Sequence, residues 1–216
     1  MIALLQTYWP LFIEGFINTL FSSVIALVFS LIIGILMGIL QISDNKIIRG
    51  LANAYVEFFR NIPLLVIVMF FYVAIPMYLF NITGFWAGTI GLTIYTSSFI
   101  ADNVRAGILT VPNGQVEASL SQGMKRSSMM RYVILPQAIR IIIPPLGNQF
   151  INLVKNSSIL AMVAGLDLMY FGDFVAMETF NTFDSYILIG LFYLTITLPL
   201  THFVKRLEVK LGIHNN

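Results

Sequence analysis

The stretch E-A-S-L-S-Q-G-M-K-R-S-S-M-M-R-Y-V-I-L-P, residues 117–136, decides how the rest of this chain is organised. It is the longest polar and basic interruption of an otherwise apolar sequence. Its first half fits a short amphipathic helix in which Ala118, Leu120 and Met124 share one face. Gly123 permits a helix end, and the final proline marks the entry to the next apolar segment. Such a segment in a membrane protein predicts a docking site for another protein.

The composition indicates a membrane protein and not a soluble domain. Hydrophobic residues make up 58% of the 216 residues and charged residues only 10%, against about 25% charged in ordinary soluble domains. Apolar segments of roughly 20 residues recur, the length that crosses the hydrocarbon core of a bilayer. The absence of Cys excludes disulfides, a Cys-based zinc site and a thiol nucleophile. No Lys or Arg precedes the first apolar segment, so a cleaved signal peptide is not expected.

Five apolar segments predict an all-α membrane protein with a single domain over residues 1–216 and five transmembrane helices. Residues 1–10 are expected to lie at the membrane interface. Gly34 and Gly38 form a small-xxx-small face suited to close helix packing. The fourth segment is longer than one straight span needs, so it is expected to be broken or partly interfacial. The expected spans are about 12–41, 55–80, 85–109, 133–166 and 185–204, with a cytoplasmic helix at about 115–126.

The distribution of Lys and Arg predicts the orientation of the chain. All of these residues except Lys155 fall in the segments 42–60, 105–140 and 205–210. Because cytoplasmic loops carry an excess of Lys and Arg, the N-terminus is expected outside and the C-terminus in the cytoplasm. The 167–185 segment has no cation and is expected to be an acidic outer loop, either merely solvated or in contact with a partner. Its acids are Asp167, Asp173, Glu178 and Asp184.

Asp102 is the first candidate for substrate binding, because it lies inside the third expected span. An acid there costs about 2.5–3.5 kcal/mol on insertion scales and usually lines a polar path. Two interpretations stay open: Asp102 holds the ammonium group of an amino acid, or it forms an internal ion pair with Arg105 or Lys155. Ser98 lies one turn earlier on the same face, and the neighbouring Asn103 is a further candidate.

A polar run, Lys155-Asn156-Ser157-Ser158, interrupts the fourth apolar segment. If the helix breaks there, free N–H groups and the Lys charge suit a carboxylate. The alternative is hydrogen bonding between helices by Ser and Asn. Together with Asp102, the run would supply opposite charges for a zwitterion. Glu57 and Arg60 are three residues apart and are expected to pair.

Several motifs, in this order along nearly the whole chain, resemble those of the membrane-spanning subunit of type I ABC importers. The nearest group is the polar amino acid uptake family, with its histidine, glutamine and arginine permeases. Residues 117–136 are similar to the family's EAA loop, in which Ser119 replaces the second Ala and Val133 replaces an Ile. The loop positions that keep the pattern are Glu117, Ala118, Gly123, Leu135 and Pro136. The other motifs are G-F-I-N-T-L at 15–20, Y-V-E-F-F-R-N-I-P-L-L at 55–65, Y-T-S-S-F-I-A-D-N-V-R-A-G-I at 95–108 and N-L-V-K-N-S-S-I-L at 152–160.

The resemblance implies that the loop docks in a groove of a cytoplasmic ATPase subunit, whose closure switches access from outside to inside. The chain has no G-x-x-x-x-G-K-[ST] motif, so it is not expected to be an enzyme. ATP and Mg²⁺ are expected on two partner ATPase subunits, with no cofactor on this chain. A second permease subunit, identical or homologous, and an extracytoplasmic amino acid-binding protein are the other expected partners, in a bacterial plasma membrane. The basic residues fit the topology rule, so no nucleic acid is expected.

Two departures from the family pattern bear on the substrate. Ile62 stands where Thr is usual, and Asp102-Asn103 stands where Glu and an apolar residue are usual. Two other classes of protein are alternatives to an importer subunit. An ion-gradient-driven secondary transporter needs no docking segment and often has internal repeats, whereas a membrane anchor needs no Asp and Lys inside its spans. His202 and His214 lie too far apart in sequence to suggest a metal site.

Overall fold

The computed structural model describes residues 1–211, and all regular structure within them is helical. His214, weighed above as a metal ligand, lies outside the described residues. The α-helices are α1 (Ile2–Leu40), α2 (Lys46–Asn61), α3 (Leu64–Met69), α4 (Ile75–Tyr78), α5 (Gly84–Leu109), α6 (Asn113–Ser121), α7 (Arg126–Met129), α8 (Leu135–Asn156), α9 (Leu168–Thr179) and α10 (Thr182–Lys210). Two π-helices, η1 (Phe70–Ala74) and η2 (Met130–Ile134), and one 3₁₀ helix, η3 (Ser157–Val163), complete the set.

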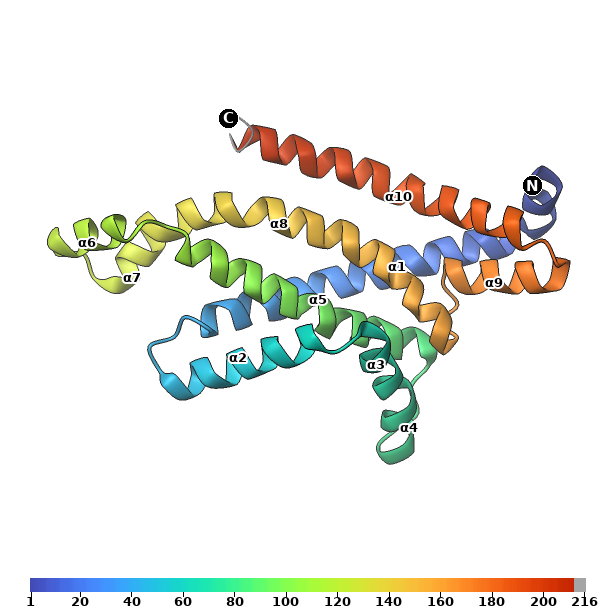
Figure 1. The fold of residues 1–216 in the computed structure, drawn as a ribbon, viewed down its shortest axis with the longest axis horizontal. Coiled ribbons are helices and arrows are strands. Elements are labelled where there is room, and N and C mark those ends of the chain that lie inside the picture. Colours follow the sequence, from blue (N-terminus) through green and yellow to red (C-terminus); the bar gives the residue numbers. More distant parts are fainter. Residues whose placement is uncertain (212–216) are drawn as a thin grey trace.

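The long helices lie side by side along one axis, with α1 and α5 at the centre (Figure 1). Helix α8 packs on α5, and α10 packs on α8, whereas α2 lies on the other side of α5. The short helices α3 and α4 project sideways from this bundle (Figure 1). Because α5 is enclosed by its neighbours, its small and hydroxyl-bearing residues are largely buried.

Glycines bring α1 and α5 into contact, as the sequence predicted. A Cβ atom on Gly34 would lie 2.5 Å from Ile100 Cγ2, and one on Gly38 would lie 2.7 Å from the carbonyl oxygen of Ala101. Both distances are shorter than real Cβ contacts allow. The small-xxx-small face on the first helix is therefore confirmed as the seam between the two central helices.

Prolines explain the irregular helical turns. The π-helix η1 ends just before Pro76, and η2 ends just before Pro136. Proline has no N–H group and clashes with the preceding turn, so the helix widens there to keep its remaining hydrogen bonds. The fourth apolar segment changes from α to 3₁₀ geometry after Asn156 and ends at Ala164, which has φ 52°. This break agrees with the expectation for a segment that is too long for one span.

The second expected span is not one helix. Helix α2 begins at Lys46, where the Asn45 side chain accepts hydrogen bonds from two backbone N–H groups, and it ends at Asn61. Ile62 then adopts an extended conformation, as a residue before proline is constrained to do. The chain bends by 104° at this break before α3 and α4. The span expected as one helix at about 55–80 is therefore broken at Pro63.

By length and composition, α1 and α10 each qualify as membrane spans among the described residues. Two further spans are possible if each strongly bent helix pair counts as one, α2 with α3–α4 and α7–η3 with α9. Helix α1 also starts ten residues before its expected span. The coarse prediction of an all-helical membrane protein therefore stands.

The expected acidic outer loop is largely the helix α9. Asp167 is fully buried and caps this helix by accepting hydrogen bonds from the backbone N–H groups of Met169 and Tyr170. Asp173 accepts a hydrogen bond from the Tyr186 hydroxyl at 2.7 Å. These acids therefore serve local structure in α9 and α10, and the segment is not a solvated loop.

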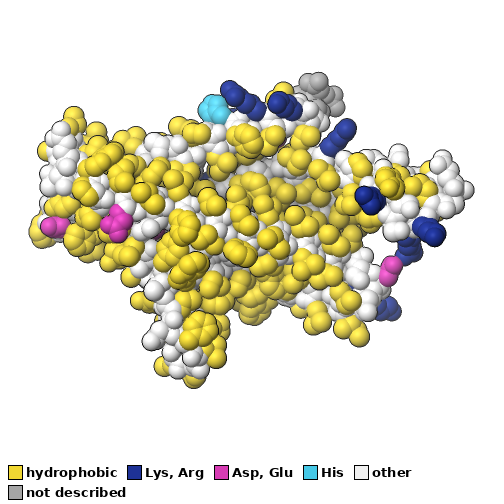
Figure 2. All heavy atoms as spheres, turned by 180° about the vertical axis from the view of Figure 1, so that it is seen from behind, with side chains coloured by type: hydrophobic (Ala, Val, Ile, Leu, Met, Phe, Trp, Pro, Cys, Tyr) yellow, Lys and Arg dark blue, Asp and Glu magenta, His cyan; other side chains and the backbone are white. Residues whose placement is uncertain are grey.

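Lys and Arg concentrate toward one end of the long axis, where an acidic side chain is also visible, and further acids lie at the opposite end (Figure 2). Lys and Arg gather at the end that carries α6, α7 and the last turns of α10. The acids on α9 and at the start of α10 lie at the other end, where α1 begins. Between the two ends, the visible surface is almost entirely apolar (Figure 2).

Candidate functional site: an ion cluster and an exposed docking helix

Helix α6, which the sequence predicts to dock on a partner, contacts the bundle through few side chains. Ser119 is buried, and its hydroxyl donates to the Gln115 carbonyl at 2.6 Å. Val116 and Met124 pack against an apolar cluster at this end of the bundle. The buried members of that cluster come from α5 to α8 and are Ile100, Val104, Ile108, Val111, Met129, Ile134, Ala138 and Ile142. A displacement of α6 would therefore act on α5 and α8 together.

The other face of α6 is exposed. Glu117 and Ala118 are exposed, and Leu120 keeps 46% of its surface accessible. The apolar face predicted from Ala118, Leu120 and Met124 is therefore wrong, because Met124 lies beyond the end of the helix and Val116 and Ser119 make the buried side. An acid beside an exposed Leu and Ala gives α6 a mixed polar and apolar surface that points away from the bundle.

Gly123 ends α6 earlier than predicted. Its φ of +76° is left-handed, which glycine adopts without steric cost. The N–H group of Gly123 donates to the Leu120 carbonyl, and the N–H group of Met124 donates to the Ser119 carbonyl. This is the hydrogen-bond pattern of a glycine helix cap. The helix therefore covers Asn113–Ser121, not about 115–126.

The segment after α6 returns to the membrane bundle through α7 and η2. Arg126 Nη1 lies 2.6 Å from Asp44 Oδ2, which joins this segment to the turn after α1. Both side chains are highly exposed, so the pair adds little stability. Leu135 and Pro136 stand in the first turn of α8, directly after the π-helix. They lie where the chain passes from α7 and η2 into α8.

Asp102 is the centre of an ion cluster between α2 and α5. Its Oδ2 atom lies 2.8 Å from Arg60 Nη1, and its Oδ1 atom lies 3.8 Å from Arg105 Nη1. The Arg60 guanidinium also lies over the Phe99 ring, 5.2 Å from its centroid. About a third of each charged side chain remains accessible. The cluster holds two cations and one anion, so it keeps one positive charge in excess.

Arg60 is the member of this cluster that sequence reasoning missed. It was paired with Glu57 from their spacing, but the structure turns Arg60 toward Asp102 instead. A second cross-link between the same helices stands nearby, since the hydroxyls of Tyr55 and Ser97 are 2.6 Å apart. The Y-V-E-F-F-R-N stretch therefore places two polar side chains of α2 on α5, a pattern with the i, i+5 spacing of Tyr55 and Arg60.

The other α5 candidates differ in accessibility. Ser98 is fully buried, and its hydroxyl donates to the Tyr95 carbonyl at 2.6 Å. Asn103 is half-buried, and its Nδ2 atom is buried without an acceptor among the described residues. An amide donor left without a partner costs free energy, so Asn103 is a group that gains from a ligand acceptor.

The run from Lys155 to Ser158 lies elsewhere on the bundle. Its serines donate their hydroxyls to carbonyls one turn back, Ser157 to Val154 and Ser158 to Lys155. The backbone continues from α8 into the 3₁₀ helix η3, so no helix N-terminus with free N–H groups opens here. Lys155 is exposed, whereas Asn156 is half-buried.

Two close contacts of α5, one with α8 and one with η3, determine how far Lys155 lies from Asp102. Gly107 packs on Ile142, and Gly88 packs on Leu160, so α8 and η3 run antiparallel to α5. At this register, Lys155 lies beside residues near 93 of α5, about nine residues from Asp102, or roughly 14 Å along the helix. Within one chain, the structure therefore does not bring the two charges together around one zwitterion.

The described residues thus form a helical bundle with an ion cluster between α2 and α5 and an exposed helix α6 at its basic end. Residues 30–212 match the family of binding-protein-dependent transport system inner membrane components. The chain belongs to this family.

Individual relatives match over nearly the whole chain. The chain is 51% identical to the probable glutamine ABC transporter permease protein GlnM of Bacillus subtilis (strain 168), over 97% of each chain. It is 36% identical to the glutamine transport system permease protein GlnP of Escherichia coli (strain K12), over 94% of each chain. The crystal structure of an amino acid ABC transporter with histidines superposes with a TM-score of 0.89 at 36% identity, covering 95% of this chain and 96% of that one.

A more distant solved structure shares the fold alone. An inward-facing form of the MetNI methionine ABC transporter has a TM-score of 0.74 at 21% identity and covers 94% of this chain and 98% of that one. The resemblance to type I ABC importer permeases is therefore confirmed, and with it the prediction of an ATP-driven permease subunit for an amino acid. The ion-gradient-driven alternative gains no support.

Proposed function

We propose that this chain is the permease subunit of an importer that carries glutamine across the bacterial plasma membrane. The observation that carries the proposal is the 51% identity to a relative named as a probable glutamine ABC transporter permease, which extends over 97% of both chains. A second relative named for glutamine, at 36% identity, supports the same substrate. Glutamine offers a carboxylate, an ammonium group and a neutral amide, all of which need polar partners inside a membrane.

The proposed membrane arrangement has five spans. The spans are α1, the bent pair of α2 with α3–α4, α5, the bent segment from α7 to α9, and α10. Helix α5 has 26 residues, enough to cross the hydrocarbon core at 1.5 Å per residue. Its Thr and Ser side chains are buried among the other helices, where polar groups are tolerated. The gathering of Lys and Arg at the α6 end supports a cytoplasmic α6 and C-terminus and an outer N-terminus.

The proposed partners follow from this arrangement. Two cytoplasmic ATPase subunits bind ATP and Mg²⁺, and each receives an α6 helix on its surface. Two permease subunits, identical or homologous, surround one path about a two-fold axis. An outer binding protein delivers the amino acid to the α9 end. The exposed Glu117, Ala118 and Leu120 support docking, because together they give α6 a mixed polar and apolar surface that a partner can cover.

Substrate recognition is proposed at the Asp102 cluster. The excess positive charge of Arg60 and Arg105 suits the α-carboxylate, and Asp102 suits the ammonium group. The Nδ2 group of Asn103 supplies a donor for the side-chain amide oxygen of glutamine. Ser98 supports this wall of the site from inside the helix. A carboxylate that exchanges Arg60 between Asp102 and the substrate would loosen the α2–α5 contact during transport.

Lys155, Asn156, Ser157 and Ser158 are proposed as a second polar station on the same path. Their distance from Asp102 places them nearer the α9 end, where the substrate arrives. Lys155 would attract the carboxylate, and the Asn156 amide would hydrogen-bond to it. Ser157 and Ser158 would keep the irregular turn in place through their bonds to the backbone.

Uptake into vesicles that contain the assembled transporter tests the substrate assignment. A panel of glutamine, glutamate, arginine and histidine separates amide from charged side chains. The expected result is preference for glutamine, with Asp102→Asn and Lys155→Ala each weakening its apparent affinity. Asp44→Asn, at an exposed acid outside the proposed path, is a control that leaves the affinity unchanged. Equal uptake of all four amino acids, or affinity unchanged in both site variants, would overturn the proposed site.

A further inference from the structure

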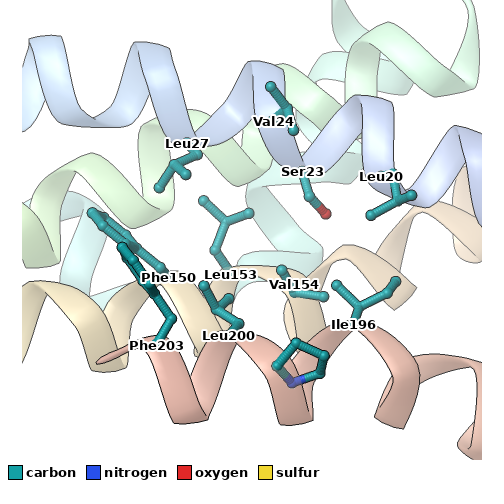
Figure 3. A pocket seen from close by; sticks show the side chains of 11 residues that line it. Leu20, Ser23, Val24, Leu27, Phe150, Leu153, Val154, Ile196, Leu200 and Phe203 are labelled. Carbon is teal, nitrogen blue, oxygen red and sulfur yellow. The ribbon is translucent and has the colours of Figure 1, made fainter. Parts of the chain in front are cut away.

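A cavity of about 400 Å³ lies between α1, α8 and α10, away from the ion cluster (Figure 3). Its walls are almost wholly apolar and include Leu20, Leu27, Phe150, Leu200 and Phe203. The Phe150 and Phe203 rings approach each other from α8 and α10 at one end (Figure 3). Ser23 is the only hydroxyl on the wall; it is buried, and it has no partner among the described residues.

The cavity runs along the membrane helices. It follows α1 from Leu20 to Leu27, which corresponds to about 10 Å at 1.5 Å per residue. The same length of α10 borders it from Ile196 to Phe203. An elongated slot of this shape suits a hydrocarbon chain, because the Ser23 hydroxyl is the single side-chain polar group that its lining residues offer to a polar substrate or to water.

Cations stand at one end of this slot. On α10, Phe203 is followed at i+3 by Arg206 and at i+7 by Lys210, so all three share one face of the helix. On α8, Arg140 lies seven residues before Gly147, the residue that packs on Val204 of α10. All three cations are exposed, and none forms an ion pair with another residue in the range 1–211.

Arg206 and Lys210 also border a hollow of about 390 Å³ with His202 and Lys205 on the same last turns of α10. The basic hollow therefore lies on the last turns of α10, within about one helical turn of Phe203, the last residue of α10 that lines the apolar slot. An anionic phospholipid has this same order of chemistry, with a hydrocarbon chain joined to a phosphate.

We propose that an anionic phospholipid of the cytoplasmic leaflet occupies this site, with one acyl chain in the slot and its phosphate on Arg206, Lys210 and Arg140. The assignment to that leaflet rests on the proposed orientation, in which this end of the bundle faces the cytoplasm. The bound lipid fills a space between three spans and joins α10 to α8 beside the docking segment. The site binds both the phosphate and the acyl chain of the lipid. It therefore discriminates between headgroups as well as holding the hydrocarbon chain.

Native mass spectrometry of the purified transporter tests the proposal by a readout that is independent of transport. The complex is titrated with phosphatidylglycerol and with phosphatidylcholine of identical chains. We expect preferential retention of phosphatidylglycerol. Removal of two cations in the double variant R206A/K210A lowers that preference by about 25-fold, since each cation near an anionic surface contributes about fivefold. The double variant K46A/R49A removes the same two charge types from the exposed start of α2 and leaves the preference unchanged.

A second variant tests the slot. Leu200→Trp fills the cavity, so retention of both lipids falls while the complex stays assembled. Equal preference in wild type and R206A/K210A would mean that these cations do not hold the headgroup. An equal loss in K46A/R49A would mean that cations act only through overall charge. Either result would overturn the proposal. Separation of the permease subunits by Leu200→Trp would also overturn it, because the slot would then be an interface between chains. Failure of glutamine uptake with normal lipid retention would count against the proposed substrate alone.

Discussion

The docking helix α6 and the Asp102 cluster lie close together in sequence but satisfy their polar groups in opposite ways. On α6, the apolar contacts face inward and Glu117 and Leu120 face outward with no contact to use them. In the cluster, Asp102 is already paired with Arg60 and Arg105. On the proposed function, a partner covers the exposed surface of α6, whereas Asp102 must release an arginine for a ligand to bind. Coupling would then depend on the exposed side chains of α6, and substrate binding would depend on the exchange of arginine between Asp102 and the substrate.

The largest effect is expected from Asp102→Ala. It leaves Arg60 and Arg105 without their shared counter-charge and removes a charge-assisted contact, worth about 1.5–3 kcal/mol. Glutamine uptake should fall by about 10- to 100-fold, with the ATPase still attached. Uptake kinetics on purified vesicles measure this. If the ATPase were lost together with transport, the cluster would instead be part of the docking architecture.

The next largest effect is expected from Glu117→Ala on the exposed face of α6. Loss of one charge-assisted contact to a partner corresponds to about tenfold in coupled uptake. The melting temperature of the complex should hardly change, because the side chain is exposed and makes no contact within the bundle. Gln115→Ala on the same helix is the matched control. A large drop in melting temperature without loss of coupling would remove the distinction between the two regions.

A smaller effect is expected from Gly123→Ala. Forcing a residue with a Cβ atom into the left-handed region costs about 1–2 kcal/mol. The melting temperature should therefore fall by a few degrees, and coupled uptake should decrease a few-fold. Gly114→Ala is the control within the same helix, since a Cβ atom there meets nothing within 4 Å. That substitution should be neutral or stabilising by up to about 1 kcal/mol. Equal effects at both glycines would show that the turn after α6 is not a fixed element.

The smallest effect is expected from Tyr55→Phe. It removes one hydrogen bond between α2 and α5, to the Ser97 hydroxyl, worth about 0.5–1.5 kcal/mol. The ion cluster should survive, so the apparent affinity for glutamine should change less than twofold. Denaturation and uptake measured on the same preparation separate the two effects. A change in affinity as large as that of Asp102→Ala would mean that the two cross-links act as one site.

Features that depend on local sequence were predictable. The glycine face of α1, the break in the long fourth segment and the glycine turn after α6 all follow from residue type and spacing. The family was recognisable for the same reason, since its motifs are contiguous stretches. The end of α2 at Pro63 was predictable in principle, because the restriction on Ile62 is local, but it was given too little weight against the apolar run.

Pairings between helices were not predictable. Arg60 has Glu57 one turn away in sequence, and only the packing of α2 on α5 makes Asp102 its partner. Likewise, the separation of Lys155 from Asp102 depends on the antiparallel register of α8 and α5, which Gly107 and Gly88 set through their contacts. The charges in the sequence identified these residues as candidates, but they could not predict which of them lie close together in space.

On the proposed function, ATP hydrolysis by a partner drives glutamine uptake through α6. The most direct test is glutamine uptake into vesicles containing this chain with its co-purifying ATPase, measured with and without ATP and with any ion gradients collapsed. If α6 couples ATP hydrolysis to transport, glutamine uptake requires ATP, persists without ion gradients and falls by about tenfold in Glu117→Ala. Uptake that proceeds without ATP and follows an ion gradient would contradict it.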